Sequence, residues 1–126
     1  MDSDIVLSVP ARAEYVHVLR AVAAGVAARQ DFSYDEIDDL RLAVDEACGQ
    51  LFAVGGEGTW MTLGIDLVDG GVDIRVAIDT EPSPWPPPDH QDSLTWQVLS
   101  ALTDRATFER SDDGAALHLV KHRGGS

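Results

Sequence analysis

Residues 38–51, DDLRLAVDEACGQL, carry the clearest structural signal in the chain. Apolar side chains recur there at spacings of three and four, which predicts a helix with one buried face. The apolar stripe consists of Ile37, Leu40, Val44, Ala47, Cys48 and Leu51. Upstream, Ser33 and Glu36 have the spacing of a capping box, and Gly55-Gly56 is a helix-ending signal. We therefore expect a long helix that begins after Ser33 and ends near Gly55.

The flanking segments predict an ordered set of strands and helices. Apolar or alternating patterns predict strands at 4–9, 59–68, 72–79, 105–110 and 114–121, and helical spacings predict helices at 11–30 and 93–103. Asp69-Gly70-Gly71 predicts a hairpin turn, and Ser93 suits an N-cap. The order β-α-α-β-β-α-β-β predicts one α+β domain over residues 1–126, a two-layer sandwich with helices on one face of a mixed, mostly antiparallel sheet. The tail HRGGS is expected to be loose.

The composition is that of an acidic globular protein. The formal net charge is −13 and the pI is about 4.3, and such a surface repels nucleic-acid phosphates and anionic lipids. We therefore expect neither nucleic acid nor membrane as a direct partner. A basic protein partner is one interpretation of the charge, and simple solubility is the other. The N-terminus lacks a signal-peptide pattern and no apolar run approaches about 20 residues, so we expect a cytoplasmic protein.

The cysteine and histidine content gives no metal or disulfide pattern. Cys48 is the single cysteine, so no intramolecular disulfide is possible, and its place on the apolar stripe predicts a core position in preference to a redox role. No pair among the four histidines has the spacing of a metal site. These histidines are His17, His90, His118 and His122.

Glu46 and Gln50 are the first candidate site residues. They are four apart, so they share one face of the predicted helix. A carboxylate and an amide one turn apart can polarise a nucleophile and hold a hydrated cation. The alternative is an ordinary solvated helix face.

Residues 38–51 resemble the first conserved box of GHKL ATPases, the superfamily of histidine kinases and Hsp90-type ATPases. Within it, LRLAVDEAC resembles the RsbW-like anti-sigma serine kinases. DLRLAVDE and the later W-x-V-L-x-A-L at 96–102 are nearest to actinobacterial anti-sigma factors of the general stress sigma factor. The resemblance follows the element order over nearly the whole chain, and it implies a Bergerat-type fold with ATP and Mg²⁺ as cofactors.

The resemblance also implies roles for individual residues. Glu46 matches the general base, and Gln50 stands where the family has the Mg²⁺-contacting Asn. Asp79 matches the adenine-binding Asp, although prolines replace the glycines that normally follow it. The third box, HQDSLTWQVLSALTD, has no glycine, and Ser93 is its candidate anion contact. The last box, often Gly-Thr before the final strand in the family, appears here as Gly114-Ala115, without the hydroxyl. Three of four nucleotide signatures are thus altered, which predicts a degenerate ATP site.

Partner contacts are predicted on the first helix and in the proline-rich loop. In the family the sigma factor docks near the first helix of a dimer, which implies Arg20, with Arg12 nearby, and a possible homodimer. An arginine fork pairs well with carboxylates, although a solubilising charge is the commoner role. Trp85, framed by five prolines between Pro82 and Pro88, is predicted as an exposed recognition residue. Packing over the sheet is its alternative.

Three functions follow as hypotheses. The first is an anti-sigma factor that sequesters an alternative sigma factor and is countered by a STAS-domain anti-anti-sigma factor. The second is an active ATP-dependent serine kinase that phosphorylates a STAS-domain antagonist. The third is a non-catalytic module whose partner is not a sigma factor. The same fold is consistent with all three.

Overall fold

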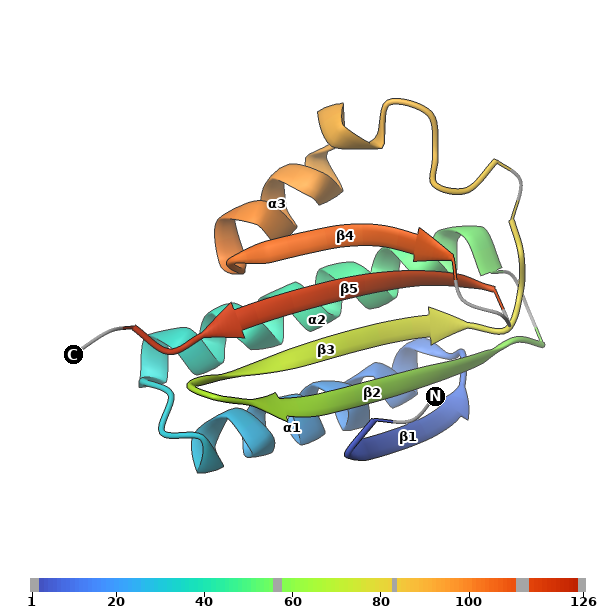
Figure 1. Cartoon of the computed structure of the whole chain (residues 1–126). Helices are drawn as coiled ribbons and strands as arrows, with labels where there is room; N and C mark the ends of the chain where they lie inside the picture. The colour runs from blue at the N-terminus through green and yellow to red at the C-terminus, as the bar shows by residue number, and fades with distance from the viewer. Residues whose placement is uncertain (1–2, 56–57, 83, 111–113, 125–126) are drawn as a thin grey trace.

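The computed structural model describes residues 3–55, 58–82, 84–110 and 114–124 and places them in two layers (Figure 1). The strands are β1 (Ile5–Pro10), β2 (Trp60–Val68), β3 (Gly71–Ile78), β4 (Arg105–Arg110) and β5 (Ala115–His122). The helices are α1 (Ala13–Arg29), α2 (Tyr34–Gly55), the short 3-10 helix η1 (His90–Asp92) and α3 (Leu94–Leu102). Apart from η1, this is the predicted element order.

The strands form one five-stranded sheet in the order β1-β2-β3-β5-β4, and every neighbouring pair is antiparallel. The three α-helices cover one face of the sheet (Figure 1). The predicted α+β sandwich is therefore confirmed, with a fully antiparallel sheet in place of a mixed one. Connections between successive strands at β2–β3 and β4–β5 are short, which antiparallel pairing permits.

Alternation along the strands separates a buried face from an open one. Met61, Leu63 and Ile65 of β2 point to the helices, and the register places Ile78, Val76 and Ile74 of β3 beside them. Such cross-strand apolar pairs stabilise a sheet. At the β2–β3 turn Gly70 adopts a φ of +74°, a conformation in which glycine has no steric penalty.

The second helix has the predicted cap and core stripe. The Ser33 N–H donates to Glu36 Oε1 at 2.7 Å, and the Glu36 N–H donates to Ser33 Oγ at 3.2 Å, which is a complete capping box. The stripe residues Leu40, Val44, Ala47, Cys48 and Leu51 are fully buried. Ile37 packs against that core at its edge.

The C-terminal tail is more ordered than predicted. The backbone N–H of Arg123 donates to Gly70 O at 2.8 Å, its side chain donates to Gln30 O at 3.0 Å, and the Gly124 N–H donates to Glu36 Oε2. The prediction of a loose tail is therefore wrong for 122–124, because β5 continues to His122 and these contacts fasten the chain after it. Residues 125–126 lie outside the described part of the chain. No helix in that part is long and apolar enough to cross a membrane.

Candidate functional site

Glu46 and Gln50 lie side by side on α2 and share one hydrogen-bond partner from α3. The Thr95 hydroxyl lies 3.0 Å from Glu46 Oε1 and 3.1 Å from Gln50 Oε1. A hydroxyl has a single hydrogen, so Thr95 can donate to one of these oxygens at a time. The sequence predicted that Glu46 and Gln50 share a face. It did not predict the contact with Thr95, because Thr95 lies 49 positions after Glu46 and 45 positions after Gln50 along the chain.

The other end of α3 is fastened as well. Lys121, with 9% of its surface exposed, donates from Nζ to Leu102 O at 2.8 Å, and its Nζ lies 3.9 Å from Asp39 Oδ2. A cation at a helix C-terminus is favourable because it satisfies a carbonyl and complements the helix dipole. We call the contacts at the two ends, Thr95 with Glu46 and Gln50 and Lys121 with Leu102, the α3 clasp. It joins the start of α3 to α2 and the end of α3 to β5.

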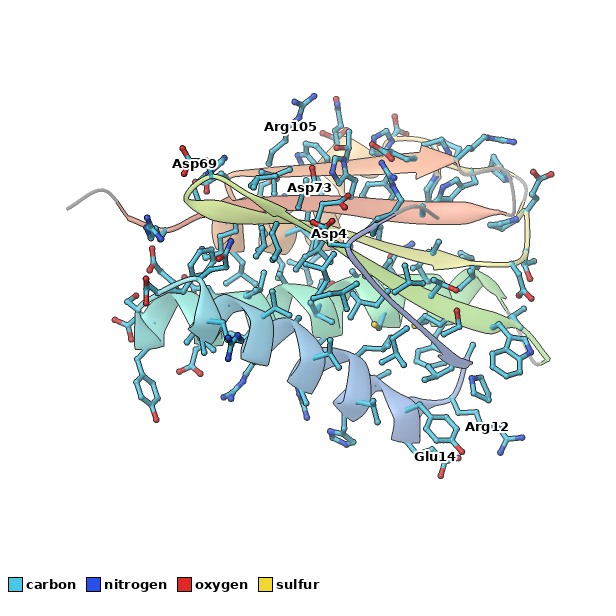
Figure 2. The ribbon with its side chains drawn as sticks, turned by 60° about the horizontal axis from the view of Figure 1, so that its bottom comes forward. Asp4, Arg12, Glu14, Asp69, Asp73 and Arg105 are labelled. Atoms are coloured by element: carbon cyan, nitrogen blue, oxygen red, sulfur yellow. The ribbon has the colours of Figure 1, made fainter. Side chains whose placement is uncertain are left out.

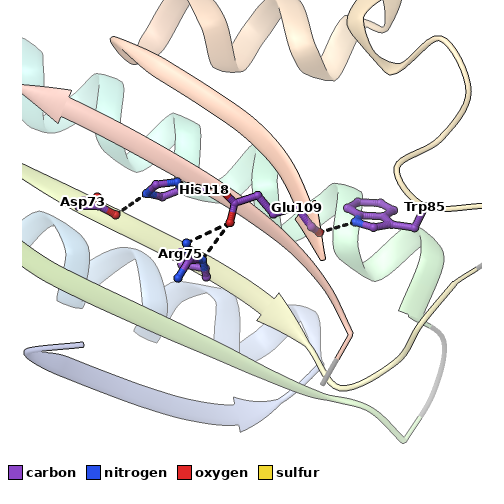
Figure 3. Close-up of polar contacts among 5 residues, drawn as sticks. All are labelled: Asp73, Arg75, Trp85, Glu109 and His118. Atoms are coloured by element: carbon purple, nitrogen blue, oxygen red, sulfur yellow. Dashed lines mark hydrogen bonds and ion pairs between the residues drawn. The ribbon is translucent and has the colours of Figure 1, made fainter. Parts of the chain in front are cut away.

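An aromatic cluster lies between η1, α3 and β4. Trp85 and His90 pack on Phe108 with ring centroids 5.4 and 4.8 Å away, and His90 meets Trp96 edge-on at 5.9 Å. The Trp85 Nε1 donates to Glu109 O at 2.7 Å (Figure 3). Trp85 is only 3% exposed, so the prediction of an exposed recognition residue is wrong. Its ring packs on Phe108 and its N–H satisfies a β4 carbonyl, which is the packing alternative.

Asp79 and Ser93 have structural partners of their own. Asp79 is exposed, and its Oδ1 accepts from the Trp60 N–H at 2.8 Å, which joins the ends of β2 and β3. The Ser93 Oγ accepts from the Trp96 N–H at 3.1 Å and donates to His90 O at 2.5 Å. Ser93 is thus the predicted N-cap of α3. The structure brings Glu46 and Gln50 together, while Asp79 and Ser93 bond to their own local elements.

Glu46 and Gln50 each present an oxygen to the Thr95 hydroxyl, at the place where the family resemblance puts the general base and the Mg²⁺ contact. Magnesium requires near-ideal octahedral oxygen geometry, and here the oxygens of Glu46 and Gln50 face the Thr95 hydroxyl. Gly114, in the position of the family's last glycine box, has a structural reason to be glycine. A Cβ there would lie 2.3 Å from Ile78 O and 2.4 Å from Thr80 O.

A second candidate site is a groove of about 620 Å³ on the outer surface of α1 and α2. Its lining consists of His17, Arg20, Ala21, Asp38, Arg41, Leu42 and Asp45. The Arg20 Nη1 lies 2.7 Å from Asp45 Oδ2, and its Nη2 contacts His17 Nδ1. Arg12 does not line the groove: it lies just before α1, exposed, with Nη1 3.7 Å from Glu14 Oε1 (Figure 2). Of the lining residues, only Arg20 was predicted as a partner contact. Asp45 was not, although it directly precedes Glu46 in the segment 38–51.

The open face of the sheet carries a charged network (Figure 3). His118 lies between two carboxylates, with Nε2 2.5 Å from Asp73 Oδ1 and Nδ1 3.1 Å from Glu109 Oε1. Arg75 Nη2 is 3.0 Å from Glu109 Oε2. Within the described ranges, no group of three or more His, Cys, Asp or Glu is arranged to hold a metal ion. The contacts of His118 and Arg75 join β3, β4 and β5 through their side chains.

Comparison with known proteins agrees with this architecture. Residues 9–121 match the family described as Histidine kinase-like ATPase domain, and the chain belongs to that family. A 44-residue stretch, 35% of this chain, is 50% identical to proteins named Serine-protein kinase RsbW from Bacillus thuringiensis (strain Al Hakam), Bacillus cereus (strain B4264) and Bacillus anthracis (strain A0248). The matched stretch spans 28% of each relative. The predicted resemblance to RsbW-like GHKL proteins is confirmed.

Proposed function

We propose that this chain is a cytoplasmic anti-sigma factor. It sequesters an alternative sigma factor, and a STAS-domain anti-anti-sigma factor competes for it. Membership of the Histidine kinase-like ATPase family and similarity to RsbW proteins support the proposal. A homodimer, as implied by the family resemblance, is part of it.

The groove between α1 and α2 is the observation that carries the proposal. Arg20 was predicted from the resemblance alone, and it lines this groove beside the apolar surface of Leu42, which is 55% exposed. Val18, on α1, is 42% exposed. A partly exposed arginine next to exposed apolar side chains is the composition of many binding hot spots. We therefore place the sigma-factor contact here.

A degenerate ATP site is the second part of the proposal. The Thr95 hydroxyl contacts the side-chain oxygens of Glu46 and Gln50. The side chains of Asp79 and Ser93 are hydrogen-bonded to backbone groups. The third box lacks glycines, which normally let the backbone approach phosphates. Release of the sigma factor therefore depends on competition between protein partners and not on phosphate transfer.

Binding to a panel of purified sigma factors from the source organism tests the proposal. We expect one alternative sigma factor to bind, and the complex to inhibit transcription by its polymerase holoenzyme in vitro. Arg20→Ala should weaken binding at least about tenfold, the effect of removing a buried charge contact at an interface. Arg29→Ala is the matched control, since Arg29 is an exposed arginine in the last turn of the same helix. Binding of none of the sigma factors would refute the proposal.

An active serine kinase is the second candidate function. Two observations favour it: Glu46 stands at the position that matches the family's general base, and the chain is similar to proteins named Serine-protein kinase RsbW. Incubation with radiolabelled ATP, Mg²⁺ and a purified STAS-domain protein distinguishes the two. Phosphate on the STAS protein that is lost with Glu46→Gln would establish the kinase, because a general base cannot be replaced by an amide. We expect no transfer.

A further inference from the structure

Two ion pairs line the groove between α1 and α2. Arg20 pairs with Asp45 at 2.7 Å, and Arg41 pairs with Asp38 at 3.4 Å. These four charges cancel, whereas the whole chain carries a formal charge of −13. An acidic side chain of a partner therefore meets less repulsion at this groove than over the rest of the surface.

The two pairs differ in how they hold their arginine. Arg41 and Asp38 are three residues apart on one helix, and both side chains are at least half exposed. Arg20 and Asp45 join α1 to α2, and about a third of each side chain is exposed. Arg20 is also held by His17. A guanidinium has five N–H donors in a planar fork, so Arg20 is an oriented cation with capacity for a further acceptor.

Asp45 uses only one of its two carboxylate oxygens in the contact with the Arg20 guanidinium. Its Oδ2 accepts from Arg20, but its Oδ1 is buried and has no hydrogen-bond partner among the residues that the structure describes. A buried oxygen without a donor is destabilising, since it has lost its hydrogen bonds to water. A carboxylate that approaches the fork in its plane can accept two parallel hydrogen bonds, which is the strongest arginine–carboxylate geometry.

We infer that Asp45 is an intramolecular stand-in for a carboxylate of the partner. On docking, the Arg20–Asp45 pair is exchanged for a pair between Arg20 and an acidic side chain of the bound protein. Asp45 turns into water, where its Oδ1 regains hydrogen bonds. A partly exposed ion pair contributes little to stability, so the exchange is readily reversible. This inference rests on the proposed function and adds that Asp45 lowers the affinity for the partner.

Replacement of Asp45 tests the exchange directly. Asp45→Asn keeps the side-chain shape and removes the competing charge. It should bind the sigma factor selected from the panel about fivefold to tenfold more tightly than the wild-type chain. Asp45→Ser is a second variant for the case in which Asn retains the hydrogen bond to Arg20. Isothermal calorimetry gives the affinities, and circular dichroism verifies that each variant is folded.

Asp38→Asn is the matched control, because it removes the same charge from the same groove without contacting Arg20. If its gain in affinity equals that of Asp45→Asn, long-range electrostatics explains both and the exchange is refuted. The gain should also vanish when Arg20 is absent. Asp45→Asn added to Arg20→Ala should therefore leave the affinity unchanged, and a persisting gain would refute the exchange.

The two proposals fail in different ways. If the wild-type chain binds a sigma factor but Asp45→Asn and Asp45→Ser bind it no more tightly, only the exchange is wrong. If no sigma factor binds the wild-type chain or any variant, the proposed function and the exchange are both wrong.

Discussion

At the scale of single residues, burial changes the reactivity of the Cys48 thiol. Its thiol is fully buried on the inner face of α2. Burial, assisted by the negative charge of nearby Asp45, raises the pKa of Cys48 to about 12. Only the thiolate reacts with disulfide reagents, so at pH 8 roughly one molecule in ten thousand is reactive. We expect the native protein to be inert to a chromogenic disulfide reagent over an hour.

The denatured chain is the control for that measurement. In denaturant the thiol is exposed and its pKa returns to the ordinary range, so one equivalent should react within minutes. Rapid stoichiometric labelling of the native protein would contradict the core position and would reopen a redox role for Cys48.

At the level of elements, the N-terminus of α2 predicts a pH-dependent stability. The pKa of Glu36 lies below its ordinary value of 4.5, mainly because its carboxylate accepts from the Ser33 backbone N–H and also from the Gly124 N–H. A lowered folded-state pKa stabilises the protein above about 4.5. This stabilisation is lost as the pH falls from there through the folded-state pKa.

Glu36→Gln measures this contribution. At pH 7 the variant should unfold a few degrees below the wild-type protein, and this difference should shrink as the pH falls below 4.5 and through the folded-state pKa of Glu36. Glu14→Gln is the control, since Glu14 also lies in the first turn of a helix, α1, and its Oε1 lies 3.7 Å from Arg12 Nη1 at the exposed surface. A difference for Glu36→Gln that is independent of pH would show that the carboxylate charge is not the cause.

The α3 clasp gives a second prediction for an element. Thr95→Val keeps the side-chain volume but removes the donor to Glu46 and Gln50. A hydrogen bond to a charged group is worth about 1.5 kcal/mol, so opening of α3 should become about tenfold more frequent. Native-state hydrogen exchange of the amides in 95–102 measures this opening. Thr107→Val on β4 is the control, and equal protection of α3 in the wild-type and Thr95→Val proteins would contradict the clasp.

For the whole molecule, local sequence patterns predicted the helices and strands of the two layers, whereas the contacts of the candidate site depend on residues far apart in the sequence. The capping box at Ser33 and Glu36, the stripe on α2 and the Asp69-Gly70 turn are signals within a few residues, so the elements and their order were predictable. The contact of Thr95 with Glu46 depends on how α3 packs, which no local pattern encodes. Trp85 was predicted to be exposed because its proline neighbours favour a loop, but the inward-facing Phe108 that buries it lies on β4.

The contacts of Thr95 with Glu46 and Gln50 lead to a prediction about the stability of the whole fold. A ligand that binds only the native state stabilises it, by about 2.7 kcal/mol at a concentration of 100 times its Kd. If the site accepted Mg²⁺–ATP at micromolar concentration, millimolar ATP would therefore raise the unfolding temperature by several degrees. We expect no such rise, because Thr95 engages the two side chains that would meet the cation and the attacking group. Differential scanning fluorimetry with ATP alone, Mg²⁺ alone and both together measures the effect. A saturable rise that requires both and disappears in Gln50→Ala would show that α3 yields to nucleotide, and would favour the kinase function over sequestration without nucleotide.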